Sequence, residues 1–381
     1  MTKNPNYCIE ALIVGAGPTG LTLGICLLRQ GKSVLIVEKH ETSLNFSRAI
    51  LVNSDTLEAL EPYGVSDKLR LAGIPVNGFS IYANNQLVSQ AQFDLSDIDH
   101  FHPLCLPQLK TEECLLETFL QTGGQIIRGY EFDASNKKDI DNQYTITLRS
   151  NLESKDNIIV NYLWLFGCDG YHSAVRENLD IPFTGNHIVE KGYAVDAHLD
   201  YWPYKTNVNV WFSANGAGLA IQIAVNTVRI IATTKAICQK LMSQLPIKVI
   251  SWEADFDIHF KVTNSYGRNH VWLAGDAVHV HSPLGGRGMN MGIADAIALA
   301  KYFNQNNLKN YQLIRMPIAH EWVKNNYRIS KIVMKQGLIY SFFRLCISIL
   351  LSILGKLGGN KFAAFVFGKI STAKVKLAEG A

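Results

Sequence analysis

The stretch Ile13–Gly20 (IVGAGPTG) constrains the fold of this chain more than any other. It lies between a hydrophobic strand pattern and an apolar helical pattern, and a second strand-like run follows and ends at Glu38. Strand, glycine turn, helix, strand and acidic residue, in that order, predict the βαβ unit that binds a dinucleotide. In such a unit Gly15 allows the tight turn, Gly17 lets the backbone approach a pyrophosphate, and Gly20 allows the helix to pack closely on the strand.

The same unit indicates which dinucleotide binds. Pro18 and Thr19 open the helix, whose free N–H groups and dipole favour a negatively charged pyrophosphate. Glu38 stands at the distance expected for a carboxylate that binds a ribose hydroxyl, and Lys39 follows it. Because a carboxylate at this place argues against a 2′-phosphate, the sequence predicts FAD or NAD rather than NADP at this loop.

Composition places the chain among globular proteins with a large core. Of its 381 residues, 48% are hydrophobic and 18% are charged, so wholesale disorder is not expected. A net charge of +4, without basic runs interleaved with aromatics, argues against nucleic-acid binding. The seven cysteines are scattered and form no CxxC pair, which favours a reducing compartment. Since the N-terminal residues are polar and show no signal peptide, we expect a cytoplasmic protein.

Hydrophobic periodicity predicts the remaining elements. Helices are expected after Asn53 or Ser54 and over 111–122, 289–302 and 317–336. Strands are expected within 76–95 and at 143–149, 158–160, 162–166, 193–199, 208–212, 218–224 and 228–233, with 162–166 as a buried central strand. No linker or internal repeat appears, so the domains are expected to be interleaved.

Two further groups of residues follow strand patterns. Asp169-Gly170 ends the central strand and precedes Ser173 and Arg176, which suits either an anion site or a simple helix N-cap. Later, a short apolar strand leads to Asp276, whose carboxylate can accept a hydrogen bond from a ribityl or ribose hydroxyl. A glycine-rich turn, Pro283–Asn290, then opens a helix whose N-terminus can stabilise charge on an anionic ring.

With these three motifs in order, the chain resembles the para-hydroxybenzoate hydroxylase-like flavoprotein monooxygenases (group A) over roughly residues 9–320. The resemblance implies an α/β fold in which a Rossmann-like FAD-binding domain is interleaved with a β-sheet substrate domain, followed by C-terminal helices. The implied boundaries are 1–75, 101–185 and 259–316 for the FAD-binding domain, 76–100 and 186–258 for the substrate domain, and 317–381 for a helical cap.

The resemblance also implies roles for individual residues. Glu38 would bind the adenosine ribose, Arg48 and Gln108 would contact the phosphate and ribityl regions, and Asp276 would hold the ribityl chain. Pro283 would be the catalytic position, because its backbone carbonyl would face the site between flavin and substrate. Arg287 departs from the family, since many relatives have Gln there. The implied cofactor-binding residues are Gly15, Gly17, Pro18, Thr19, Gly20, Glu38, Lys39, Arg48, Gln108, Asp169, Asp276, Pro283, Gly286, Gly288, Met289 and Asn290.

The implied reaction is a hydroxylation. NADPH or NADH would dock transiently near Asp169 and Arg176 and reduce the FAD, and dioxygen would then form a flavin hydroperoxide that oxygenates an aromatic or polycyclic phenolic compound. Inactivation of an antibiotic such as a tetracycline is one subtype, which would confer antibiotic resistance. The alternative is a related FAD-dependent reductase or oxidase that acts on a lipid or isoprenoid without oxygen insertion. A monomer or homodimer is expected.

The substrate side offers fewer signals. Trp211 and Phe212, with Trp202 and Tyr204 nearby, are candidates for the wall of a pocket, and ordinary sheet packing is the alternative. His281 is a candidate substrate contact. With His279 it is also a candidate acid or base, against a structural, hydrogen-bonded role for each. No metal is expected, because His279-x-His281 lacks a third ligand nearby.

The most hydrophobic run of the chain lies near its C-terminus, at 338–354. It is short for a membrane span, which takes about 20 apolar residues, and it contains Arg344. Two interpretations stay open. The run caps the FAD domain and the mouth of the active site, or it makes a peripheral membrane contact helped by the basic residues on either side.

Overall fold

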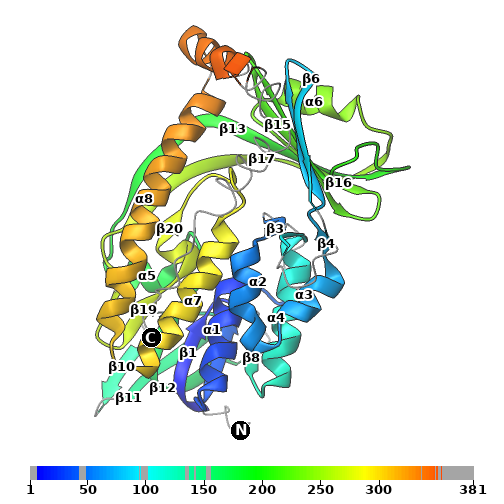
Figure 1. The fold of residues 1–381 in the computed structure, drawn as a ribbon. Helices are drawn as coiled ribbons and strands as arrows, with labels where there is room; N and C mark the ends of the chain where they lie inside the picture. Colours follow the sequence, from blue (N-terminus) through cyan, green and yellow to red (C-terminus); the bar gives the residue numbers. More distant parts are fainter. Residues whose placement is uncertain are drawn as a thin grey trace.

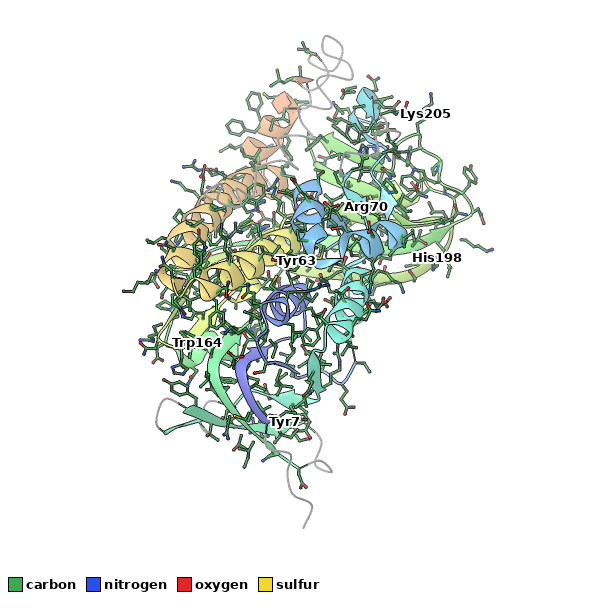
Figure 2. All side chains as sticks on the ribbon, turned by 60° about the horizontal axis from the view of Figure 1, so that its bottom comes forward. Tyr7, Tyr63, Arg70, Trp164, His198 and Lys205 are labelled. Atoms are coloured by element: carbon green, nitrogen blue, oxygen red, sulfur yellow. The ribbon has the colours of Figure 1, made fainter. Side chains whose placement is uncertain are left out.

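A computed structural model describes residues 7–42, 49–93, 95, 102–133, 137–140, 143–151, 156–335, 337–347, 349–350 and 353, with the backbone alone at 137–140 and 143. Two sheets make up most of it (Figure 1). The first sheet and its helices form the lower part of the view, the second sheet lies above them, and α8 (Leu308–Met334) runs along one side of both. In Figure 2, Tyr7 and Trp164 mark strands of the first sheet, and His198 marks the second.

The first sheet is built around β1. Its path runs β10-β11-β12-β1-β2-β8, and β1 pairs in parallel with both β12 and β2. The residues at its centre, such as Leu12 and Ile13, are wholly buried, as expected for a parallel strand covered on both faces. The strands are β1 (Tyr7–Val14), β2 (Val34–Glu38), β8 (Gln125–Arg128), β9 (Tyr130–Glu131), β10 (Lys137–Ile140), β11 (Gln143–Ser150), β12 (Ile158–Gly167), β18 (Gly267–Arg268) and β19 (Val271–Leu273).

The second sheet is mostly antiparallel and runs β20-β17-β13-β16-β15-β14-β5-β6. One face packs against α6, and the other faces the first sheet and its helices, which we call the first domain. Its strands are β5 (Gly78–Ala83), β6 (Gln86–Gln92), β13 (Phe183–Leu199), β14 (Val208–Ser213), β15 (Gly216–Ala224), β16 (Thr227–Ala232), β17 (Ile247–Thr263) and β20 (His279–Val280). A small sheet of β3 (Leu51–Val52), β7 (Leu104–Cys105) and β4 (Ile74–Pro75) lies between the two domains.

The helices of the first domain pack around α1, which contacts α7 on one side and α4 on the other. The bounds of these helices, and of α6 on the second sheet, are α1 (Pro18–Arg29), α2 (Ser54–Leu60), η1 (Glu61–Tyr63), α3 (Ser66–Ala72), α4 (Gln108–Gln121), α5 (Ala174–Asn178), α6 (Lys235–Met242), η3 (Gly275–Ala277) and α7 (Gly288–Asn304). A further helix covers 338–347 after α8. Within the described ranges, no helix is both long enough and apolar enough to cross a membrane.

The predicted fold class is confirmed, and so is the interleaving of the two sheets along the chain. The expected helix at 111–122 begins earlier, at Gln108. The expected start of the long helix at 317 was wrong, because α8 begins at Leu308 and contains Pro317. Pro317 lacks the N–H that would bond the carbonyl of Leu313, but both residues lie on the exposed side of α8, where water can take that place. The central strand also departs from the prediction, since Leu163 is 43% exposed.

Candidate functional site

In the glycine loop between β1 and α1, two glycines are required by the fold, and a third leaves space for a ligand. Gly15 has φ of +103°, and a Cβ there would lie 2.4 Å from the carbonyl oxygen of Cys168. A Cβ on Gly20 would lie 2.0 Å from the Gly15 carbonyl oxygen. Gly17 differs, because its φ of −74° suits any residue and a Cβ would meet nothing within 4 Å. The fold therefore requires Gly15 and Gly20, whereas the open space at Gly17 fits a cofactor pyrophosphate.

Glu38 lies beside this loop, at the end of β2. Its Oε2 accepts a hydrogen bond from the Ala16 N–H at 2.9 Å, and its Oε1 accepts one from the His40 N–H at 3.0 Å. The carboxylate is thereby held against the backbone of the glycine loop, at the residue before Gly17. Lys39, the next residue, is exposed.

The second motif caps a helix. The Ser173 hydroxyl donates to Asp169 Oδ1 at 2.5 Å, and the Val175 N–H donates to Asp169 Oδ2 at 3.2 Å. Ser173 in turn accepts a hydrogen bond from the Arg176 N–H and is the N-cap of α5. The helix-cap interpretation therefore accounts for the local geometry of Asp169.

The third motif meets the first through Thr19. Asp276 is exposed in η3, whereas its neighbours Gly275 and Ala277 are buried. A Cβ on Gly275 would lie 2.5 Å from Thr19 Oγ1, and one on Gly292 would lie 2.3 Å from the same atom. The start of α1, the turn that carries Asp276 and the first turns of α7 are therefore in direct contact.

A buried ionic network holds the backbone of this motif. Asp295 on α7 accepts from the Gly275 N–H at 3.2 Å, pairs with Arg315 Nε at 2.6 Å and bonds His279 Nε2 at 2.7 Å. All three side chains are at most 2% exposed. Burial alone would raise the pKa of Asp295, but Arg315 and His279 lower it below its ordinary value. His279 thus has the structural role that was one of its two interpretations.

Side chains of α8 fix the loop at the start of the glycine-rich turn. The sequence did not predict these contacts. Asn326 Oδ1 accepts from the Ser282 N–H at 3.1 Å and from the Ser282 hydroxyl at 2.8 Å. Asn326 Nδ2 donates to the Leu284 carbonyl at 3.0 Å, and Ser330 bonds the Ser282 hydroxyl at 2.8 Å. Between these contacts Pro283 is exposed, and its carbonyl accepts the Gly286 N–H at 2.9 Å. Nothing in the sequence pattern pairs Asn326 with a loop some 40 residues earlier.

The N-terminus of α7 is joined to the small sheet by Asn290. Its Oδ1 accepts from the Asn53 N–H at 2.9 Å, and its Nδ2 donates to the carbonyls of Leu51 at 2.9 Å and Gly286 at 2.8 Å. Gly288 opens the helix, and a Cβ there would meet nothing within 4 Å. The space beside Gly288 at the N-terminus of α7 is therefore open, and a helix N-terminus favours a negatively charged group. Met289 packs against the core of the domain.

His281 and Arg287 are both engaged by Trp322 of α8. The Trp322 Nε1–H donates to His281 Nε2 at 3.2 Å, and His281 Nδ1 bonds the Ser282 carbonyl at 2.8 Å. Burial lowers the pKa of His281 to about 4, so the ring is neutral at pH 7. The Arg287 guanidinium lies 5.0 Å from the centre of the Trp322 ring. These contacts favour the structural role for His281.

One of the other expected cofactor contacts, Gln108, is the first residue of α4. Gln108 Oε1 accepts from the Ala49 N–H at 3.2 Å, and its Nε2 donates to Glu112 Oε1 at 2.8 Å. Gln108 therefore ties the chain at Ala49 to α4. Arg48 lies outside the described residues.

The expected pairing of Trp211 and Phe212 in one pocket wall needs correction. Trp211 stacks on Tyr82 with ring centres 4.8 Å apart and belongs, with Trp202 and Tyr204, to the cluster under α6. Figure 1 shows α6 on the side of the second sheet away from α2 and α4. Phe212 points to the opposite face, because successive residues of a strand alternate. Sheet packing is therefore the role of the two tryptophans and Tyr204, and Phe212 alone faces the first domain.

Known proteins match this arrangement. The family model described as "FAD binding domain" matches residues 8–243 and 228–325. Rifampicin monooxygenase of Rhodococcus hoagii is 28% identical over 352 residues, which cover 83% of this chain and 70% of that protein. The 12-dehydrotetracycline 5-monooxygenase/anhydrotetracycline 6-monooxygenase of Streptomyces rimosus is 27% identical over 354 residues, with 83% and 68% covered.

Solved structures share the fold. The p-nitrophenol 4-monooxygenase of Pseudomonas putida superposes with a TM-score of 0.80 at 19% identity, covering 97% of this chain and all of that one. The family model alone spans well over half of the residues, and the resemblance to group A flavoprotein monooxygenases is confirmed. The chain belongs to the FAD-binding-domain family.

Proposed function

We propose that this protein is an FAD-dependent monooxygenase that uses NAD(P)H and dioxygen to hydroxylate an aromatic or polycyclic phenolic compound. The observation that carries the proposal is the junction at Thr19. There the open space at Gly17 and the motif that carries Asp276 come together at the first turns of α1 and α7. The names of the relatives, which include rifampicin and tetracycline-pathway monooxygenases, agree with it.

The residues of the junction fit the parts of FAD. Gly17 and the N-terminus of α1 would hold the pyrophosphate, Glu38 the adenosine ribose and Asp276 the ribityl chain. The open space at Gly288, at the N-terminus of α7, would face the ring. When bound, FAD supplies the redox chemistry that activates dioxygen toward an electron-rich ring. The protein contributes by keeping the loop at Pro283 in place through Asn326.

An apolar wall between the second sheet and α8 suits a flat, apolar substrate. Phe212 packs both with the cluster that faces the first domain and with the cluster that includes Val323 of α8. Leu284 of the flavin loop and Tyr327 of α8 belong to the same second cluster. Such a wall would exclude water from the reacting atoms, and this favours oxygen transfer over release of hydrogen peroxide. We therefore propose Phe212 and Leu284 as substrate contacts.

A cluster of basic and aromatic side chains beside Asp169 supports docking of the phosphorylated reductant there. The Tyr171 ring stacks on His259 with centres 5.1 Å apart, and Lys261 Nζ lies 5.1 Å from the centre of Tyr171. His187 stacks on the other side of His259 at 5.0 Å. Burial lowers the pKa of His259, and the nearby His187 and Lys261 add to the effect. An anionic phosphate there would attract Lys261 and favour the protonated form of His259.

One experiment tests the function. The purified protein is given NADH or NADPH, ¹⁸O-labelled dioxygen and a panel of phenols, naphthacenes and ansamycins, while hydrogen peroxide is monitored. We expect substrate-stimulated NAD(P)H oxidation with one labelled oxygen atom in the product. Substrate conversion without label would instead favour a reductase or oxidase. Lipids and isoprenoids would then be added to the panel of test substrates. Peroxide formation alone would count as uncoupled turnover and would not support the proposal.

A further inference from the structure

The helix over 338–347 has its apolar side turned outward. Eight of the described large hydrophobic side chains in this helix and directly after it are exposed, and six of these are at least half exposed. A helix at a protein surface usually shows the reverse, with its apolar side buried against the core. At about 100° per residue, the exposed apolar positions fall within an arc of roughly 160°. They are Leu338 (91% exposed), Ile339 (69%), Phe342 (63%), Phe343 (50%), Leu345 (38%), Ile349 (49%), Leu350 (53%) and Ile353 (51%).

The one charge of this helix points inward. Arg344 is 2% exposed, and its guanidinium donates to the carbonyls of Ile332 at 3.0 Å and Lys335 at 2.6 Å at the end of α8. It also donates to the carbonyl of Ala214, in the turn between β14 and β15, at 3.0 Å. Arg344 therefore fastens the helix to α8 and to the second sheet. Its charge, which counts against burial in lipid when read from sequence alone, lies on the side away from the exposed apolar face.

Charge around the helix is strongly one-sided. Ten of the chain's 36 lysines and arginines fall between residues 322 and 378, whereas none of its 32 aspartates and glutamates does. The rest of the chain is therefore net acidic, and the basic charge gathers around the apolar run. The ten are Lys324, Arg328, Lys331, Lys335, Arg344, Lys356, Lys361, Lys369, Lys374 and Lys376.

We propose that the exposed face of this helix binds the surface of an anionic phospholipid bilayer. The apolar side chains would enter the boundary between headgroups and acyl chains, and the lysines at the end of α8, Lys331 and Lys335, would contact the headgroups. The helix would lie in the plane of the interface, held to the enzyme by Arg344. Charge complementarity selects this occupant, because a second copy of the chain would bring the same basic segment against itself.

The test uses the full chain loaded with FAD and vesicles of phosphatidylcholine, with and without phosphatidylglycerol. We expect the protein to sediment with the anionic vesicles and at least tenfold less with the neutral ones, and binding to fall at about 0.5 M salt. A variant with Leu338, Ile339 and Phe342 all replaced by Gln should lose at least tenfold of the binding. Because these side chains are exposed, its flavin absorbance and circular dichroism should not change.

A matched control replaces three equally exposed apolar residues elsewhere, Leu71 (89% exposed), Val189 (80%) and Leu313 (64%), with Gln, and should bind vesicles like the parent. Equal binding to both kinds of vesicle, or unchanged binding of the helix variant, would overturn the proposal. So would a parent that ignores vesicles and elutes as a dimer while the helix variant elutes as a monomer, since a second copy would then cover the face. None of these results depends on the substrate reaction.

Discussion

The hydrogen bonds from Asn326 to the flavin loop lead to the most specific prediction. Replacing Asn326 with Leu keeps the size of a side chain that is 4% exposed but removes its oxygen and nitrogen. The Ser282 N–H, which is buried, loses its acceptor, and the Leu284 carbonyl loses its donor. The Ser282 hydroxyl keeps its bond to Ser330.

The expected cost follows from those two groups. An unpaired buried N–H costs about 1–3 kcal/mol, and the carbonyl of Leu284, a residue that is only partly buried, costs about 1 kcal/mol or less. The total is about 1–4 kcal/mol. If only the loop is disturbed and not the whole domain, this cost appears as roughly 5- to 900-fold weaker FAD binding. Any part of this cost that destabilises the whole domain lowers the free energy of unfolding by that part.

The assay is titration of the apoprotein with FAD, followed by flavin fluorescence, together with thermal unfolding of apoprotein and holoprotein. Asn325→Leu is the matched control, because Asn325 is the exposed neighbour on the same helix and should leave both measurements unchanged. An Asn326→Leu protein with FAD affinity within twofold of the parent and an unchanged melting temperature would refute the role given to α8.

Three further predictions concern the same region. Gly17→Val should fold, because its φ is permissive and its surroundings are open, but it should purify without flavin; a yellow, folded variant would show that the loop does not hold the pyrophosphate. Asp295→Asn leaves a buried guanidinium without its counter-charge, so denaturant unfolding should show a loss of about 3–5 kcal/mol, and a loss below about 1 kcal/mol would argue against the network. Because burial lowers the pKa of His281 to about 4 from 6.5, the unfolded chain takes up a proton in this window while the folded chain does not. Stability should therefore fall as pH drops from 6.5 toward 4, by up to about 1.4 kcal/mol per unit. His281→Gln should flatten that slope, and replacing the exposed His198 should leave it; a slope unchanged by His281→Gln would contradict the assignment.

Local rules account for the part of the site that the sequence could predict. The roles of Gly15 and Gly20 follow from backbone contacts between neighbouring elements, and those contacts are the same wherever this βαβ unit occurs. Several strands of both sheets were predicted from side-chain alternation and apolar runs, which depend on the chain's own period, but the long strand β17 was not. The motif at Asp276 follows a strand that is recognisable by itself. These features need no knowledge of distant residues.

Tertiary structure decided the features that depend on which surfaces meet. Alternation predicts that Trp211 and Phe212 point to opposite sides of the sheet. Only the position of α6 shows that Trp211 lies in the core on the side that faces away from the first domain. Asn326 is one of many polar residues on a long helix until α8 lies against the flavin loop. Arg344 looks like an interruption of an apolar run until the turn at Ala214 accepts its hydrogen bond. A side chain's partner across tens of residues is set by packing between layers, whereas the sequence alone determines the period, the turns and the motifs.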